Sequence, residues 1–239
     1  MTNVAAAPRD IVERGRSNGL RALLFDLDGT LIDTAPDIAL ALQRTLRWLG
    51  RPGVDMALVR GWIGDGARAL LDKALGEAST DAQWEHFAYE YGAACGEASG
   101  LYPGVATMLE RLGAAGVKLA VVTNKETRFA HRLLVKHGIS AHFDVLVAGD
   151  SLPVKKPHPA GVHHALEALQ VEPADAALVG DSVIDLRTAR AAGVQAWLVT
   201  HGYGAADVES AERPERTFAG FSDLDLACIG AGPAPVAIC

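Results

Sequence analysis

Five short apolar segments recur along the chain, and each of them ends in polar residues. They are "RALLFD" at 21–26, "VKLAVVT" at 117–123, "DVLVAGD" at 144–150, "AALVGD" at 176–181 and "VQAWLVT" at 194–200. Continuous apolar runs of this length are typical of strands that are covered on both faces. We therefore predict a buried sheet of five strands.

Between most of these segments, apolar residues recur at helical spacing. Val105, Met108, Leu109 and Leu112 form one such face, at positions i, i+3, i+4 and i+7. Alternation of strand and helix indicates βαβ units, and therefore an α/β protein with a Rossmann-like parallel sheet and helices on both sides. In such sheets the functional groups collect at the carboxyl ends of the strands.

The interval from 35 to 101 breaks this alternation, because it holds no strand pattern and three helical ones. The first predicted helix has a capping signal in Thr34 and Asp37 and a stop at Gly50. We interpret the interval as an all-α insertion after the first strand. The expected parts are a loose extension at 1–19, an α/β core at 20–34 and 102–226, the helical insertion at 35–101, and a tail at 227–239.

Charge and cysteine content narrow the range of partners and compartments. The 239 residues include 29 acidic and 22 basic side chains, for a net charge of -7. This balance disfavours nucleic acid and anionic lipid as partners. Cys95, Cys228 and Cys239 lack the spacing of a disulfide framework or a zinc site, which favours the cytoplasm. We also expect no secretory leader at the start of the chain and no membrane span.

Side chains suited to phosphate or metal chemistry follow four of the five predicted strands. In chain order they are Asp26, Asp28, Thr123, Asn124, Lys156, Asp181 and Asp185. Any one of them alone has an ordinary explanation, because aspartates and threonines often cap helices and a loop lysine is often solvated. In a parallel sheet, however, all of them are expected at the same edge.

Four motifs contain these residues, and they occur in a fixed order. The motifs are "DLDGT" at 26–30, "VVTN" at 121–124, "KKPHP" at 155–159 and "GDSVID" at 180–185. They resemble the four motifs of the haloacid dehalogenase superfamily, and the resemblance covers roughly residues 20 to 226. The insertion after the first motif resembles the subgroup with an α-helical cap, most similar to bacterial phosphoglycolate phosphatases. The resemblance implies a magnesium-dependent phosphatase of a small phosphorylated metabolite, with 2-phosphoglycolate as the expected substrate.

The chemistry of phosphate esters explains why such an enzyme needs these residue types. Uncatalysed hydrolysis of these esters is so slow that enzymes accelerate it by up to about 10²¹-fold. A carboxylate nucleophile divides the reaction into two easier steps through an aspartyl-phosphate. Two negative charges ~4 Å apart repel by roughly 4 kcal/mol at an effective dielectric constant near 20. A magnesium ion and a lysine would offset that repulsion.

The resemblance also implies a role for each residue. Asp26 would be the nucleophile and a metal ligand. Asp28 would protonate the leaving alcohol and later activate the water, while its backbone carbonyl contacts the metal. The remaining expected roles are phosphoryl binding by Thr123 and Asn124, neutralisation by Lys156, and completion of the magnesium site by Asp181. Gly29 is expected to give the chain the freedom to turn after Asp26.

Several residues near these motifs have more than one interpretation. Asp185 could hold Lys156 or a metal-bound water, or it could pair with Arg187 or Arg190 on its own helix. Asp33 and Thr34 are expected to cap a helix, and Lys155 is expected to be a surface charge.

The segment "GWIGDGARALL" at 61–71 interrupts two helical stripes with Gly64 and Gly66. It resembles the cap loop of phosphoglycolate phosphatases. Arg68 is the candidate for binding the substrate carboxylate, because arginine can bind a carboxylate through two parallel hydrogen bonds. The alternative is an ordinary exposed arginine on an amphipathic helix.

Other activities of the same superfamily differ in the residues that they require. Asp28 argues against a dehalogenase, which has no alcohol leaving group to protonate, and against a phosphonatase, whose members lack the second aspartate. A sugar phosphomutase of the same cap class stays open, as do phosphatases of sugar phosphates, nucleotides or pyrophosphate. A relative that only binds ligands would be expected to have lost Asp26, Asp28 or Lys156, and all three are present.

Overall fold

The structure is a computed structural model that describes residues 20–208 and 212–224. Its strands in the main sheet are β1 (Ala22–Phe25), β4 (Lys118–Val122), β5 (Val145–Val147), β6 (Ala176–Gly180), β7 (Gln195–Val199) and β8 (Arg216–Phe218). All are parallel and lie in the order β5-β4-β1-β6-β7-β8. The first five confirm the predicted strands and the parallel α/β class. The sixth was not predicted, because its three residues carry no apolar run.

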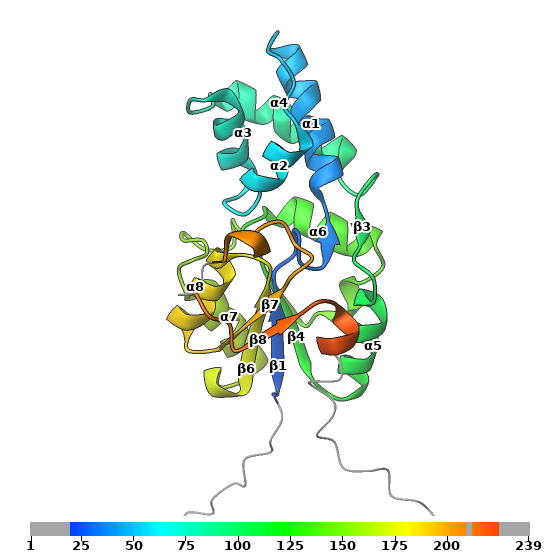
Figure 1. The fold of residues 1–239 in the computed structure, drawn as a ribbon, viewed down its shortest axis with the longest axis vertical. Coiled ribbons are helices and arrows are strands. Elements are labelled where there is room, and N and C mark those ends of the chain that lie inside the picture. The colour runs from blue at the N-terminus through cyan, green and yellow to red at the C-terminus, as the bar shows by residue number, and fades with distance from the viewer. Residues whose placement is uncertain (1–19, 209–211, 225–239) are drawn as a thin grey trace, which may run out of the picture.

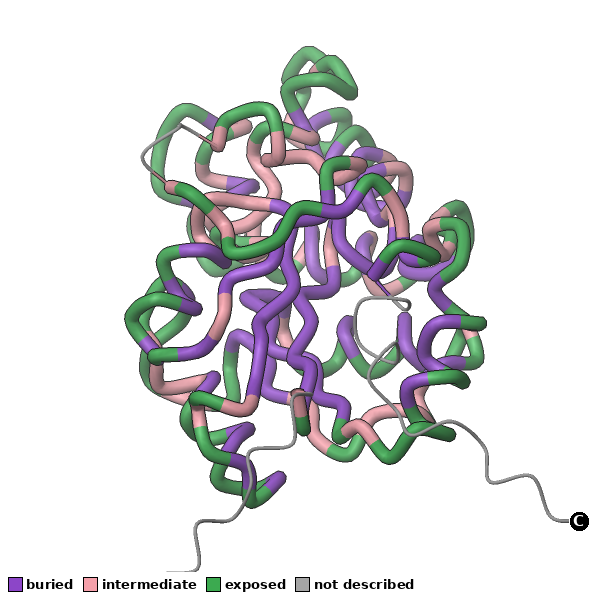
Figure 2. The backbone as a smooth tube through the Cα atoms, turned by 60° about the horizontal axis from the view of Figure 1, so that its bottom comes forward, coloured by how far each residue is buried: buried purple, intermediate pink, exposed green. Residues whose placement is uncertain are grey.

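Helices cover both faces of this sheet. Alternate residues of a strand point to opposite faces, so Leu23 and Phe25 of β1 belong to one core cluster and Leu24 to the other. The first cluster includes α5 (Val105–Ala114) and α6 (Thr127–Lys136), and the second includes α7 (Ala160–Leu169) and α8 (Val183–Ala192). Figure 2 shows the strands as a buried centre inside a more exposed shell.

The interval predicted as a helical insertion holds four helices. They are α1 (Ala35–Trp48), α2 (Met56–Trp62), α3 (Ala67–Leu75) and α4 (Asp81–Ala94). Two short antiparallel strands, β2 (Ile32–Asp33) and β3 (Gly100–Leu101), carry the chain into and out of the insertion. The strand β3 lies within the interval 35–101, which was predicted to hold no strand, because two residues are too short to leave a strand pattern. In Figure 1 the four helices lie together beyond one end of the sheet. The helix α2 was not predicted, because it buries only Val59 and therefore has no apolar stripe.

The predicted start of α1 after Thr34 and its end before Gly50 are confirmed, but the predicted side-chain cap is not formed. Thr34 occupies the N-cap position, but its side chain makes no capping hydrogen bond. The Asp37 carboxylate instead accepts hydrogen bonds from the backbone N–H groups of Gly96 and Ala98, both at 2.7 Å. Asp37 therefore ties the start of the insertion to the segment that leaves it.

Three single-turn 3₁₀ helices complete the described elements: η1 (Ser140–His142), η2 (Pro173–Asp175) and η3 (Ala205–Asp207). Among the residues that the structure describes, no helix combines the length and apolarity needed to cross a membrane. Cys95 is buried and its thiol is free. The extension at 1–19, the tail at 227–239, Cys228 and Cys239 lie outside the described residues.

Candidate active site

The sheet order brings three of the motifs side by side. β1 lies at the centre of the sheet between β4 and β6, so Asp26, Thr123 and Asp181 follow three adjacent strands. The backbone N–H of Asp26 still donates to the carbonyl of Val179 in β6, at 2.9 Å, which holds Asp26 beside that strand. Lys156 reaches the same edge from the loop between β5 and α7. Residues up to 155 positions apart in the sequence therefore meet at one point.

Lys156 lies between two carboxylates. Its Nζ donates to Oδ1 of Asp26 at 2.7 Å and to Oδ1 of Asp185 at 2.6 Å, and all three side chains are buried. Burial alone would lower the pKa of Lys156, but the charges and hydrogen bonds of Asp185 and Asp26 outweigh it and raise the pKa. Lys156 therefore stays charged at neutral pH.

The other oxygen of Asp185 caps its own helix. Oδ2 accepts from the backbone N–H of Ser182 at 3.1 Å and from the Ser182 hydroxyl at 2.7 Å. Of the interpretations of Asp185, the structure therefore has the one in which it holds Lys156. Its helix neighbours Arg187 and Arg190 pair with Glu212 instead.

Three carboxylates gather at the end of β1 and β6. Ligand oxygens of Asp26, Asp181 and Asp185 all lie within 4.8 Å of one another. Burial raises the pKa of Asp26 from 3.8 to about 6 and that of Asp181 to about 7, to which the neighbouring carboxylates add. Three carboxylates beside one ammonium leave two negative charges unbalanced. Buried hard-oxygen ligands with that charge fit a divalent cation such as Mg²⁺ or Ca²⁺.

Asp181 is held in place by residues that the sequence analysis did not select. Its Oδ1 accepts from the Thr30 hydroxyl at 3.1 Å, and its Oδ2 accepts from the backbone N–H of Tyr203 at 2.7 Å. Gly29 has a φ of +80°, and a Cβ there would lie only 2.6 Å from Oδ2 of Asp181. The expected turn at Gly29 is present, and the residue must also lack a side chain because Asp181 approaches so closely.

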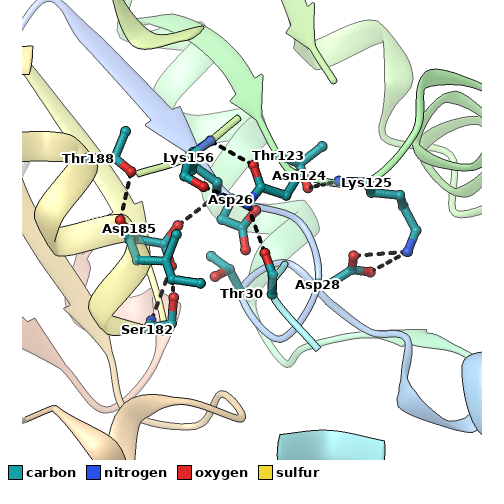
Figure 3. Close-up of polar contacts among 12 residues, drawn as sticks. Asp26, Asp28, Thr30, Thr123, Asn124, Lys125, Lys156, Ser182, Asp185 and Thr188 are labelled. Atoms are coloured by element: carbon teal, nitrogen blue, oxygen red, sulfur yellow. Dashed lines mark hydrogen bonds and ion pairs between the residues drawn. The ribbon is translucent and has the colours of Figure 1, made fainter. Parts of the chain in front are cut away.

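Asp28 points away from this carboxylate cluster, towards Lys125 (Figure 3). Lys125 Nζ donates to both carboxylate oxygens of Asp28, at 2.8 and 2.9 Å, and the Thr34 hydroxyl donates to Oδ1 at 2.5 Å. Thr34 therefore supports Asp28 with its side chain, although it was expected only to cap a helix. Lys125 was missed as well. Its position directly after the "VVTN" motif, at the same edge of the sheet, was the available signal.

Asn124 links three parts of the site. Its Nδ2 donates to the carbonyls of Gly64 and Lys156, at 2.9 and 3.0 Å, and its Oδ1 accepts from the backbone N–H of Lys156 at 2.8 Å. These contacts use both N–H groups of the side-chain amide, which was expected to bind phosphate. Asn124 thus positions the Lys156 loop and the loop of the helical insertion. Thr123 is buried beside it, and its hydroxyl oxygen accepts from the Lys125 N–H at 3.3 Å.

Two cavities meet at Asp26 and Asp28, and the loop at Ile63 and Gly64 borders both. One cavity extends over the carboxylate cluster. Its lining includes Lys156, Asp181, Ser182, Asp185 and Tyr203. The other extends between the sheet edge and the helical insertion, lined by Thr123, Asn124, Lys125, Ile38, Gly66, Ala67 and Leu70. A ligand with a charged end at the cluster would therefore place its remainder against the insertion.

Two predicted residues have other contacts. The Arg68 guanidinium donates to the Ser79 carbonyl at 3.2 Å and to Asp81 Oδ1 at 2.8 Å, and Arg68 lines neither cavity. Its contacts thus match the alternative of an exposed helix arginine. Asp33 makes no cap: its carboxylate accepts from the Tyr203 hydroxyl at 2.6 Å and from Arg60 at 3.2 Å. Lys155 is exposed, as expected.

Comparison with known proteins matches most of the chain to one family. A family model described as haloacid dehalogenase-like hydrolase matches residues 23–199. The chain is 38% identical over 212 residues to the phosphoglycolate phosphatase of Colwellia psychrerythraea, which covers 84% of this chain and 94% of that protein. The structure of a predicted phosphoglycolate phosphatase from Haemophilus somnus matches with a TM-score of 0.78 at 34% identity, covering 86% of this chain and 96% of that one. CbbY from Rhodobacter sphaeroides, solved in complex with xylulose-(1,5)bisphosphate, matches with a TM-score of 0.73 at 26% identity over 86% and 96% of the two chains.

Proposed function

The chain belongs to the haloacid dehalogenase-like hydrolase family, and from this premise we propose that it is a phosphatase that converts 2-phosphoglycolate to glycolate and phosphate. The observation that carries the proposal is the buried Asp26 carboxylate, 2.7 Å from Lys156 Nζ and within 4.8 Å of two further carboxylates. The names of the similar proteins support the substrate, because phosphoglycolate phosphatases align along most of the chain.

The proposed reaction has two steps. In the first, an Asp26 oxygen attacks phosphorus, the ester P–O bond breaks, and the leaving glycolate oxygen takes a proton from Asp28. In the second, Asp28 takes a proton from water, the water oxygen attacks the aspartyl-phosphate, and phosphate leaves with the Asp26 carboxylate restored. Lys156 would offset charge on the phosphoryl oxygens throughout. Thr123 would contact those oxygens, and Asn124 would hold the Lys156 loop in register.

The proposed metal is magnesium. Asp26 and Asp181 would hold it through carboxylate oxygens and Asp28 through its backbone carbonyl, while Asp185 would support the site from its contact with Lys156. When bound, the ion supplies positive charge that lowers the repulsion between the nucleophile and the phosphate. The donor set supports this, because the pKa values raised by burial and by neighbouring carboxylates at Asp26 and Asp181 mark unbalanced negative charge.

We also propose a domain arrangement, a compartment and a class of partner for the chain. Residues 35–101 would form a cap over a core made of residues 20–34 and 102–226. The protein would act in the cytoplasm, because its cysteine spacing predicts no disulfide framework. It would bind a small phosphorylated metabolite and would bind neither nucleic acid nor a membrane.

A panel of phosphorylated metabolites, assayed with magnesium and with a chelator, tests the proposal. The panel contains 2-phosphoglycolate, a sugar phosphate, a sugar bisphosphate, a nucleotide and pyrophosphate. We expect the highest kcat/KM for 2-phosphoglycolate, loss of activity with the chelator, and no phosphate release by Asp26→Asn. A preference for the sugar bisphosphate would favour the alternative suggested by CbbY, and wild-type activity in Asp26→Asn would remove the proposed nucleophile.

A further inference from the structure

The cavity between the sheet edge and the helical insertion contains one cationic side chain among the described residues that line it. That side chain is Lys125. We propose that Lys125 binds the carboxylate of the substrate and so selects phosphate esters that carry a second anionic group. This inference rests on the proposed function and names the residue that would recognise the acid end of 2-phosphoglycolate.

Lys125 is held as a buried cation. Its side chain is 3% exposed, and its Nζ lies 4.9 Å from the centre of the Tyr91 ring on α4 of the insertion. An aromatic face attracts an ammonium group at this distance. Burial strengthens the attraction between the ammonium and any anion that enters the cavity, because little water is present to screen it. Tyr91 therefore fixes Lys125 where it faces the space between core and insertion.

The charge partners of the two buried lysines differ. Lys156 lies between two carboxylates, Asp26 and Asp185. Lys125 has Asp28 as its carboxylate partner. An ammonium group has three N–H donors, and it can bind a second oxygen anion beside Asp28. Lys125 is thus the less neutralised of the two lysines.

The position of Lys125 matches the size of the proposed substrate. The leaving oxygen must lie next to Asp28 for Asp28 to protonate it. In 2-phosphoglycolate the carboxylate carbon is two bonds from that oxygen, across one CH₂ group. Lys125 Nζ is 2.8 Å from an Asp28 oxygen. A substrate carboxylate two bonds from a leaving oxygen beside Asp28 is therefore within reach of the Lys125 ammonium.

The other basic residues near the cavity do not fit this role. Arg68 is bonded to Asp81 and to the Ser79 carbonyl. Lys155 is exposed and does not line the cavity, although its Nζ would lie 2.9 Å from a Cβ built on Gly66. Lys155 therefore provides a matched control, because it is a lysine close to the same loop with no contact to Asp28.

Steady-state kinetics of Lys125→Met and Lys155→Met, with 2-phosphoglycolate and with ethyl phosphate, test the inference. The two esters share the phosphoryl group and the two-carbon chain, and only the first has a carboxylate. We expect Lys125→Met to lower the ratio of their kcat/KM values by about 10- to 100-fold, the range for one charge-assisted hydrogen bond. Lys155→Met should keep the wild-type ratio, and Lys125→Arg should retain more of it than Lys125→Met.

The outcomes separate the two proposals. An unchanged ratio in Lys125→Met, including equal losses for both esters, would overturn the inference, because a residue that only positions Asp28 affects both esters alike. If the wild-type enzyme itself does not favour 2-phosphoglycolate, the proposed function fails, and the inference fails with it.

A second measurement needs no variant and so does not depend on the folding of Lys125→Met. Glycolate should inhibit ethyl phosphate hydrolysis by the wild-type enzyme competitively and at least about 10-fold more strongly than glycolamide, its neutral counterpart. Equal inhibition by the two compounds would contradict a cationic contact.

Discussion

Lys156 Nζ lies 2.6 Å from Oδ1 of Asp185, and the two side chains are 4% and 2% exposed. One comes from the loop after β5 and the other from the first turn of α8. The same ammonium lies 2.7 Å from Asp26. Lys156 therefore joins the candidate nucleophile to the first turn of α8, and the fold shields the Lys156–Asp185 ion pair almost completely from solvent.

Removing the charge of Asp185 should impair both stability and catalysis. In Asp185→Asn, Lys156 keeps only Asp26 as a charged partner, and we expect a loss of about 1–3 kcal/mol in the free energy of unfolding. Urea denaturation measures it. We expect kcat/KM to fall at least about 10-fold, because a displaced ammonium no longer meets the phosphoryl group. Arg187 lies on the same helix as Asp185, and Arg187→Ala removes only an exposed contact to Glu212. This variant is the control and should match the wild type. Similar denaturation curves for both variants would contradict the argument.

The stability of the metal-free protein should decrease as the pH rises. Burial raises the pKa of Asp26 to about 6 and that of Asp181 to about 7, whereas an aspartate in the unfolded chain has a pKa near 3.8. Between these values the folded state binds more protons than the unfolded state, so the free energy of unfolding falls with pH. We expect the melting temperature in chelator to decrease from about pH 4 to about pH 7. The Asp181→Asn variant, measured over the same pH range, shows how much of the decrease comes from groups other than Asp181.

Magnesium should reduce that pH dependence, because a bound cation favours the ionised carboxylates. Melting curves with magnesium in place of chelator give this comparison. This expectation is contradicted if the melting temperature in chelator rises over the same pH range and Asp181→Asn shows the same pH dependence as the wild type. Burial would then not raise the pKa values of these carboxylates.

Gly29→Ala should be more damaging than the same change at another glycine with positive φ. An alanine at a φ of +80° costs about 1–2 kcal/mol in strain, and its Cβ would lie 2.6 Å from Asp181 Oδ2. Gly50 has a φ of +66° with nothing within 4 Å, so Gly50→Ala carries the backbone strain alone. In magnesium titrations that follow phosphatase activity, only Gly29→Ala should need a higher magnesium concentration for half-maximal activity. Equal effects of the two substitutions would mean that Asp181 has room to move.

Arg68→Ala should leave the preference for 2-phosphoglycolate over ethyl phosphate unchanged. The guanidinium is bonded to Asp81 and to the Ser79 carbonyl, both within the helical insertion. The kcat/KM ratio of the two esters is the measurement, with Lys125→Met as the positive control. A drop in the ratio for Arg68→Ala alone would return the carboxylate site to Arg68.

The sequence by itself determined the parts of the protein that depend on local pattern. Continuous apolar runs marked β1, β4, β5, β6 and β7, because a strand covered on both faces has no polar side to interrupt the run. Polar residues directly after those runs identified Asp26, Thr123 and Asp181 as candidate site residues from the sequence alone. The helix α2 and the strand β8 were missed, because short elements with one or two buried residues leave no periodic signal.

Only the tertiary structure decided which side chains contact one another. Arg68 and Lys125 are both cations near predicted site loops, but the first bonds to Asp81 and the second to Asp28. Asn124 and Asp37 likewise bind backbone groups about 30 or more residues away in the sequence. Such pairings depend on strand order and helix packing, which bring distant segments within about 3 Å of each other, the range in which hydrogen bonds form. Local sequence does not determine those distances, and so the partners of a charged residue are known only from the folded structure.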